Sequence, residues 1–179
     1  MHILVTSLER GFALEDRRDA GPVSAAAARA TAAVVVAPDA IALAQLVCER
    51  ERSAPASDPI RWVWNSQDIV PQLLAHGVRV GRCHDLRLAG RILITAGYLD
   101  ASLDVADARG GAHPGDGLFD LDAENPGTPD ATRELFEAQL GALEAADQEG
   151  PRKGALAFLV GAESAGALVA AELRAAGMP

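Results

Sequence analysis

One short pattern in the sequence combines residues of the kind that perform nucleophilic catalysis. Residues 161–166 read Gly-Ala-Glu-Ser-Ala-Gly, which is close to the Gly-x-Ser-x-Gly turn that presents a nucleophilic serine. The pattern is one residue too long for that turn, and the surrounding sequence predicts a helix rather than a strand-to-helix corner. We therefore expect Ser164 to be an ordinary helix residue.

A second pattern, His84-Asp85, contains two residue types that ligate metals. A metal site needs three or four converging ligands, and the other three histidines show no ligand spacing relative to this pair. Asp85 is better explained as the residue that caps a following helix. Cys83 is expected to be a small, buried apolar residue.

Two further patterns have structural explanations. Trp62 and Trp64 stand two residues apart in a strand-like run, so their side chains share one face. They could stack nucleic-acid bases, but in a chain with only 4% aromatic residues we expect them to anchor the core. The acidic residues between positions 116 and 124 lack the spacing of an EF-hand, so we expect a solvated acidic loop.

The order of apolar runs and turn signals predicts an α/β domain. Short apolar and β-branched runs predict strands at 3–6, 12–15, 33–37, 60–64 and 78–80. Apolar residues spaced three and four apart predict helices that begin at Pro38-Asp39, at Asn65 or Ser66, at Asp85, at Pro129-Asp130 and near residue 156. Residues 98–130 are long, acidic and glycine-rich, which indicates an insertion or a mobile flap.

The net charge of −9 is concentrated in one part of the 179-residue chain. Residues 100–150 contain 13 acidic residues against Arg109 and Arg133. Such a domain lacks the basic face of a free-standing nucleic-acid-binding protein. No run of about 18 uncharged apolar residues occurs, and the N-terminus has no signal-peptide pattern, so we expect no membrane partner. Two cysteines cannot build a disulfide framework, and a cytoplasmic location is expected.

Residues 61–93, which begin Arg-Trp-Val-Trp-Asn-Ser-Gln-Asp-Ile, resemble the middle of the 3′-5′ exonuclease domain of family A (DNA polymerase I-like) DNA polymerases. The pattern is most similar to the actinobacterial bifunctional 3′-5′ exonuclease/DNA polymerase type. Residues 162–178 are similar to the helix that opens the polymerase portion. The resemblance implies an RNase H-like (DnaQ-type exonuclease) mixed sheet flanked by helices over residues 1–150, with the acidic segment 98–130 inserted. Residues 151–179 would then be the first helix of a truncated polymerase module.

The chemistry that this resemblance implies uses two divalent metal ions, Mg or Mn, held by carboxylates from three places. The first is an Asp-x-Glu pair on strand one, where this chain has Val5-Thr6-Ser7. In the second motif Asn65 matches the family's asparagine, but the aspartate position falls on Ile69. Asp68 is one residue early, about 100° away on a helix.

The third motif of the family is a Tyr-x-x-x-Asp pattern on a late helix. Here that helix reads Leu135-Phe136-Glu137-Ala138, without the tyrosine or the aspartate. All three carboxylate sites are therefore expected to be lost, which leaves Asp68 and Glu137 as the candidate catalytic residues. Asp85 and Glu163 match motif positions without a catalytic role.

Three functions remain open. The first is a degenerate exonuclease-like domain, needing no cofactor, that supports a family A polymerase in DNA replication or repair, with the polymerase module and DNA as partners of the full-length protein. The second is an active proofreading exonuclease that uses Mg or Mn and relocated carboxylates. The third is an acidic α/β protein that binds a partner through its last helix.

Overall fold

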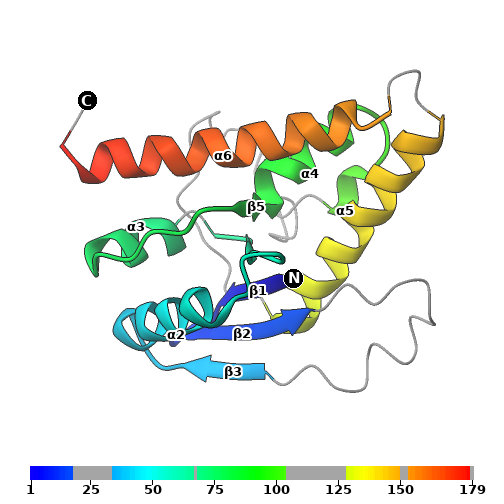
Figure 1. The fold of residues 1–179 in the computed structure, drawn as a ribbon. Coiled ribbons are helices and arrows are strands. Elements are labelled where there is room, and N and C mark those ends of the chain that lie inside the picture. Colours follow the sequence, from blue (N-terminus) through cyan, green and yellow to red (C-terminus); the bar gives the residue numbers. More distant parts are fainter. Residues whose placement is uncertain (18–33, 67, 104–127, 150–152, 178–179) are drawn as a thin grey trace, which may run out of the picture.

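A mixed five-stranded sheet with the order β3-β2-β1-β4-β5 forms the centre of the computed structural model (Figure 1). The structure describes residues 1–17, 34–66, 68–103, 128–149 and 153–177. The strands are β1 (His2–Ser7), β2 (Phe12–Arg17), β3 (Val34–Ala37), β4 (Arg61–Trp64) and β5 (Cys83–Asp85). Strand β2 is antiparallel to both of its neighbours, whereas β4 is parallel to β1 and to β5. The predicted α/β class with a mixed sheet flanked by helices is confirmed.

A tight turn joins β1 to β2. The backbone N–H of Leu8 donates to the carbonyl oxygen of Gly11 at 3.0 Å. Gly11 has φ +84°, and a Cβ at this position would lie 2.2 Å from the carbonyl oxygen of Ala37 on β3. Glycine is therefore required here both for the backbone conformation and for the close approach of β3.

Within the described ranges, five helices flank the sheet: α2 (Ala40–Ser53), α3 (Ile69–Ala75), α4 (Leu86–Thr95), α5 (Pro129–Glu149) and α6 (Ala155–Ala175). A short 3₁₀ helix, η1, spans Ala101–Leu103. The expected helices at 38, 85, 129 and 156 are present. Asp39 caps α2 as expected, because its side chain accepts a hydrogen bond from the backbone N–H of Ala42 at 2.8 Å.

Alternate residues of the strands belong to two separate cores. Ile3 and Val5 pack with Trp62 and Trp64 and with apolar residues of α2 and α3. Leu4 packs on the other side with residues of β4, α4 and α5. Helices α2 and α3 therefore cover one face of the sheet, and α4 and α5 cover the other. Both tryptophans are at most 2% exposed, which confirms that they anchor the core.

Helix α6 runs along the β5 side of the sheet (Figure 1). It contacts β5, α3 of one layer and α4 and α5 of the other. Ser164 on α6 accepts a hydrogen bond from the backbone N–H of Asp85. Because β5 is an edge strand, this bond gives one of its backbone N–H groups a partner outside the sheet.

Two local predictions around β5 are wrong. The fifth strand is Cys83–Asp85 rather than 78–80, because Trp62 of β4 pairs with Cys83. Val78 and Val80 are buried loop residues, and their alternation imitates a strand. Helix α3 begins after Asp68 rather than at Asn65 or Ser66, although Ser66 Oγ does accept a hydrogen bond from the Asp68 backbone at 3.2 Å.

Most of the predicted acidic insertion lies outside the described residues. This applies to residues 104–127 and therefore to the acidic residues between 116 and 124.

Candidate functional site

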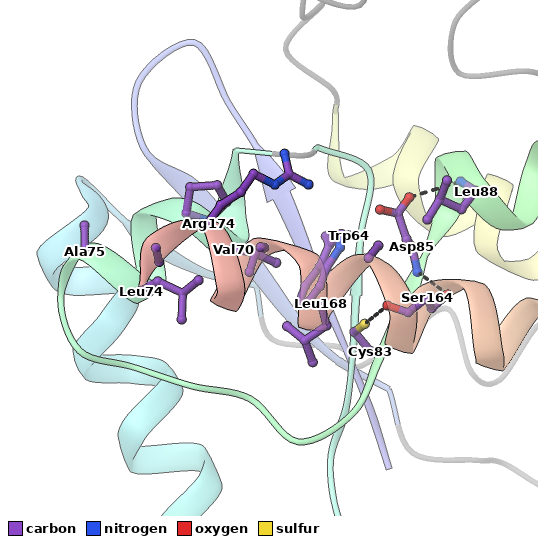
Figure 2. Close-up of a pocket in the computed structure, with 14 residues that line it drawn as sticks. Trp64, Val70, Leu74, Ala75, Cys83, Asp85, Leu88, Ser164, Leu168 and Arg174 are labelled. Carbon is purple, nitrogen blue, oxygen red and sulfur yellow. Dashed lines mark hydrogen bonds between the residues drawn. The ribbon is translucent and has the colours of Figure 1, made fainter. Parts of the chain in front are cut away.

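Asp85 stands where β5 ends and α4 begins, and it is 6% exposed. Its Oδ1 accepts hydrogen bonds from the backbone N–H groups of Arg87 and Leu88 at 3.0 and 3.1 Å, which confirms the predicted cap. Its own backbone N–H donates to Ser164 Oγ at 3.2 Å (Figure 2). Burial raises the pKa of Asp85, and the two backbone hydrogen bonds act in the opposite direction. Asp85 thus joins β5, α4 and α6.

Cys83 and Ser164 are buried partners rather than nucleophiles. The Cys83 thiol donates to the carbonyl oxygen of Ser164 at 3.3 Å. Burial raises the pKa of Cys83 to about 12, and the negative charge of Asp85 adds to the shift, so the reactive thiolate is not formed near neutral pH. Ser164 lies within α6, as predicted, and is fully buried there, which the sequence did not predict.

His84 is held neutral between β5 and α5. Its Nε2 donates to Gln139 Oε1 at 2.8 Å, and Gln139 Nε2 donates to the carbonyl oxygen of Leu86 at 2.7 Å, which orients the amide. The ring of Phe136 lies 5.5 Å away at 74°, an edge-to-face contact. Burial lowers the pKa of His84 from 6.5 to about 4, while the Gln139 hydrogen bond acts the other way.

This shift predicts a loss of stability in acid. Between pH 6.5 and about 4 the unfolded chain binds a proton at His84 that the folded chain does not, so stability falls as the pH falls through this window. The full effect is about 3 kcal/mol. Urea unfolding of wild type and His84→Gln across this range measures it. The raised pKa of Asp85 acts in the opposite sense and cancels in the difference between the two proteins. Parallel pH curves for both proteins would contradict the assignment.

A pocket of about 600 Å³ opens between α3 and α6 beside this network (Figure 2). It lies at the C-terminal ends of the parallel strands β4 and β5, where open α/β sheets commonly bind ligands. Its polar side chains are those of Asp85, Ser164 and Arg174. Most of its remaining walls are apolar.

Asn65 follows β4 and reaches the first turns of α5. Its Nδ2 donates to Thr132 Oγ1 at 3.4 Å. No described residue donates a hydrogen bond to its Oδ1, although that atom is buried. The asparagine of the second family-like motif and the helix of the third motif therefore lie next to each other.

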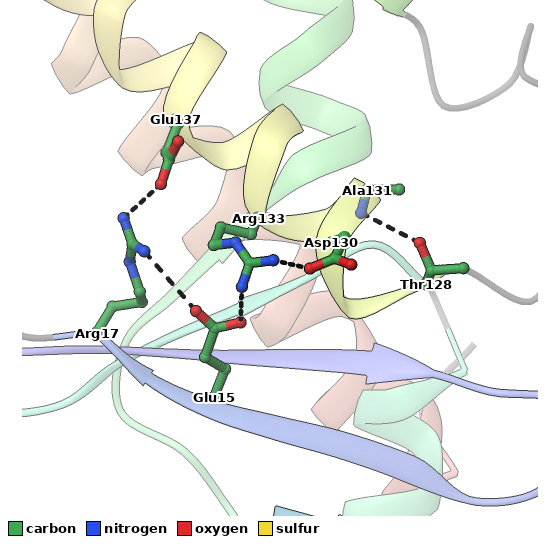
Figure 3. Close-up of polar contacts among 7 residues, drawn as sticks. All are labelled: Glu15, Arg17, Thr128, Asp130, Ala131, Arg133 and Glu137. Carbon is green, nitrogen blue, oxygen red and sulfur yellow. Dashed lines mark hydrogen bonds and ion pairs between the residues drawn. The ribbon is translucent and has the colours of Figure 1, made fainter. Parts of the chain in front are cut away.

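Five charged side chains from β2 and α5 form an ion-pair cluster close to this contact (Figure 3). Glu15, with a 3% exposed side chain, lies 3.2 Å from the Arg133 guanidinium and 3.7 Å from that of Arg17. Arg17 also pairs with Glu137 at 2.6 Å, and Arg133 pairs with Asp130. Two guanidinium groups thus pair with three carboxylates on the α5 side of the sheet.

The candidate catalytic carboxylates are not brought together. Glu137 faces the cluster on α5, whereas Asp68 is exposed at the start of α3, which packs on the opposite face of the sheet. Val5 of the strand-one motif belongs to the core under α2 and α3. By strand alternation, acidic residues at positions 5 and 7 would lie on the face opposite α5. Glu163 is exposed on α6.

These residues do not fit a pair of divalent cations. Mg²⁺ keeps its waters unless several carboxylates replace them. Within the described part of the chain no group of three histidine, cysteine, aspartate or glutamate side chains could hold a metal ion. Glu15 and Glu137 already pair with arginine, so their charge is compensated by guanidinium groups.

The sequence did not single out the residues that organise the His84 network and the ion-pair cluster. Glu15 carries a weak signal, because it is a charged residue within the predicted strand 12–15, at its last position. Arg133 and Gln139 look like ordinary polar residues of a surface helix, and Gln139 is nevertheless fully buried. Their partners lie more than fifty positions away in the chain.

The outward face of α6 is apolar over the length of the helix. Phe158, Val169, Leu159 and Leu173 are 77%, 55%, 44% and 42% exposed. By length and composition alone, this 21-residue helix could cross a membrane, although the sequence analysis predicted no membrane span. Of its most apolar 18-residue window, 17% is buried in the protein.

No family model, curated protein or solved structure matches this chain.

Proposed function

We propose that this chain is an exonuclease-like domain of a family A DNA polymerase that no longer carries nuclease chemistry and serves as a scaffold. Its fold would be RNase H-like, its location cytoplasmic, and its process DNA replication or repair. DNA and the polymerase module would be partners of the full-length protein.

The observation that carries the proposal is the strand order β3-β2-β1-β4-β5 with only β2 reversed. The sequence resemblance implies an RNase H-like sheet, and this order and these directions are compatible with one. The block that resembles the exonuclease domain begins with β4 and continues through α3, β5 and α4. It therefore includes β4 and β5, the two strands that follow β1 in the sheet order and run parallel to it.

The loss of chemistry is supported by the ion-pair cluster. Hydrolysis assisted by two metal ions needs carboxylates that are free to coordinate the cations. Here the guanidinium groups of Arg17 and Arg133 pair with the carboxylates of Glu137 and Glu15. A guanidinium neutralises charge and donates hydrogen bonds, but it cannot activate a bound water as a metal ion does.

The outward face of α6 supports a role in assembly. Four large apolar side chains, led by Phe158, remain exposed on this helix. Exposed apolar patches commonly mark sites of interaction. We assign this face to the polymerase module. The same face favours the second candidate function, in which an acidic α/β protein binds an unrelated partner.

A nuclease assay tests the catalytic part of the proposal. The purified protein is incubated with a 5′-labelled single-stranded oligonucleotide and Mg²⁺ or Mn²⁺, next to a chelator control. The oligonucleotide is expected to stay intact, because the described carboxylates do not converge. A metal-dependent ladder that shortens from the 3′ end, and that is lost in Asp68→Asn or Glu137→Gln, would instead establish the active exonuclease.

The gene tests the assignment to a polymerase. The reading frame that contains this sequence is expected to encode polymerase-like sequence after residue 179. If it does not, the family A assignment fails, and the partner-binding function becomes the better explanation of α6.

A further inference from the structure

The pocket between α3 and α6 has a size and position suited to a small molecule. Its volume of about 600 Å³ falls within the range of ligand sites in proteins. Trp64 and Cys83 contribute from the ends of β4 and β5, while Leu88 contributes from α4. It is separate from the ion-pair cluster, which lies on the α5 side of the sheet.

The two ends of the pocket carry opposite charge. At one end, Asp85 uses Oδ1 for both cap hydrogen bonds, and no described residue donates to its Oδ2. Figure 2 shows the second carboxylate oxygen directed away from Leu88 and toward the pocket. At the other end, Arg174 donates through Nε to the carbonyl oxygen of Ala170 at 3.2 Å, and no described carboxylate forms an ion pair with it.

The distance between these ends sets the length of a ligand. Arg174 folds back so that its Nε reaches the carbonyl oxygen of Ala170, which is six residues from Ser164 on α6. This separation corresponds to about 9 Å along a helix axis. The wall between them is apolar and includes Leu168 and Ala171 of α6 and Leu74 of α3.

We propose that this pocket binds an elongated, mainly apolar small molecule with a hydrogen-bond donor at one end and an anionic group at the other. The donor binds Asp85 Oδ2, and the anion pairs with Arg174 at the mouth. The apolar body supplies most of the affinity, and the two ends orient the molecule. The proposal is independent of any nuclease or polymerase role.

Isothermal titration calorimetry with three probes of equal chain length tests this proposal. The probes are ω-aminooctanoate, octanoate and octylamine, each below its micelle concentration. The first carries both end groups and should bind tightest. Each single-ended probe should bind up to about fivefold more weakly, which is the value of a partly exposed charge pair. Failure of ω-aminooctanoate to bind, or equal binding of all three, would overturn the proposal.

Variants locate the binding. Ala171→Trp places an indole in the middle of the pocket and should weaken ω-aminooctanoate binding at least about tenfold. Arg174→Gln should weaken it up to about fivefold and remove its advantage over octylamine. Phe158→Ser, on the outward face of the same helix, is the control and should leave affinity unchanged. Circular dichroism verifies that each variant is folded. Loss of binding in Phe158→Ser but not in Ala171→Trp would assign the probe to the outward face and refute the pocket.

Discussion

Replacing Glu15 with alanine is expected to lower the free energy of unfolding by about 2–4 kcal/mol, because a buried carboxylate loses charge-assisted contacts. The Glu15 side chain is 3% exposed and pairs with Arg133 at 3.2 Å and with Arg17 at 3.7 Å, and those two side chains are themselves only 21% and 19% exposed. After its removal the two guanidinium groups keep only the more exposed carboxylates of Asp130 and Glu137. Denaturant unfolding followed by circular dichroism measures the change.

Two companion variants test whether the loss is specific to the buried carboxylate of Glu15. Glu144→Ala removes an exposed glutamate from the same helix as Arg133 and should change stability by no more than about 0.5 kcal/mol. The triple variant Glu15→Leu, Arg17→Met, Arg133→Met should recover wild-type stability or exceed it, because apolar side chains of similar volume avoid the desolvation of buried charges. A Glu15→Ala protein as stable as wild type would show that the cluster contributes nothing to holding α5 on the sheet.

Replacing Gln139 with leucine is expected to cost about 2–4 kcal/mol. Gln139 is fully buried, accepts from His84 Nε2 at 2.8 Å and donates to the carbonyl oxygen of Leu86 at 2.7 Å. Leucine leaves the buried His84 N–H without its acceptor, at about 1–3 kcal/mol, and removes the hydrogen bond to Leu86, worth about 0.5–1.5 kcal/mol. Gly90 lies against this amide, since a Cβ there would be 3.4 Å from Gln139 Nε2.

The same substitution at an exposed position of α5 provides the control. Gln148→Leu should change stability by no more than about 0.5 kcal/mol in the same denaturation experiment. If both variants lose equal stability, the cost arises from leucine in the helix and not from the hydrogen bonds of Gln139.

Local sequence signals predicted most helices and strands because their causes are local. The apolar spacing of α2, α4, α5 and α6 and the caps at Asp39 and Asp85 depend on residues a few positions apart. The alternation of Val78 and Val80 is also a local signal, and it predicted a strand where the structure has a loop. Only pairing with Trp62 on β4 places the strand at Cys83–Asp85.

The sequence by itself determined the α/β class, the burial of the two tryptophans and the absence of the family's carboxylates from positions 5, 7 and 69. Only the tertiary structure decided that Glu137 meets Arg17 across 120 positions, and that α3, with the exposed Asp68 before it, packs on the other face of the sheet. It also decided that α3 and α6 leave a pocket between them. Such contacts depend on strand order and on how helices pack across the sheet, which arise from interactions between distant parts of the chain and leave no periodic signal in the sequence.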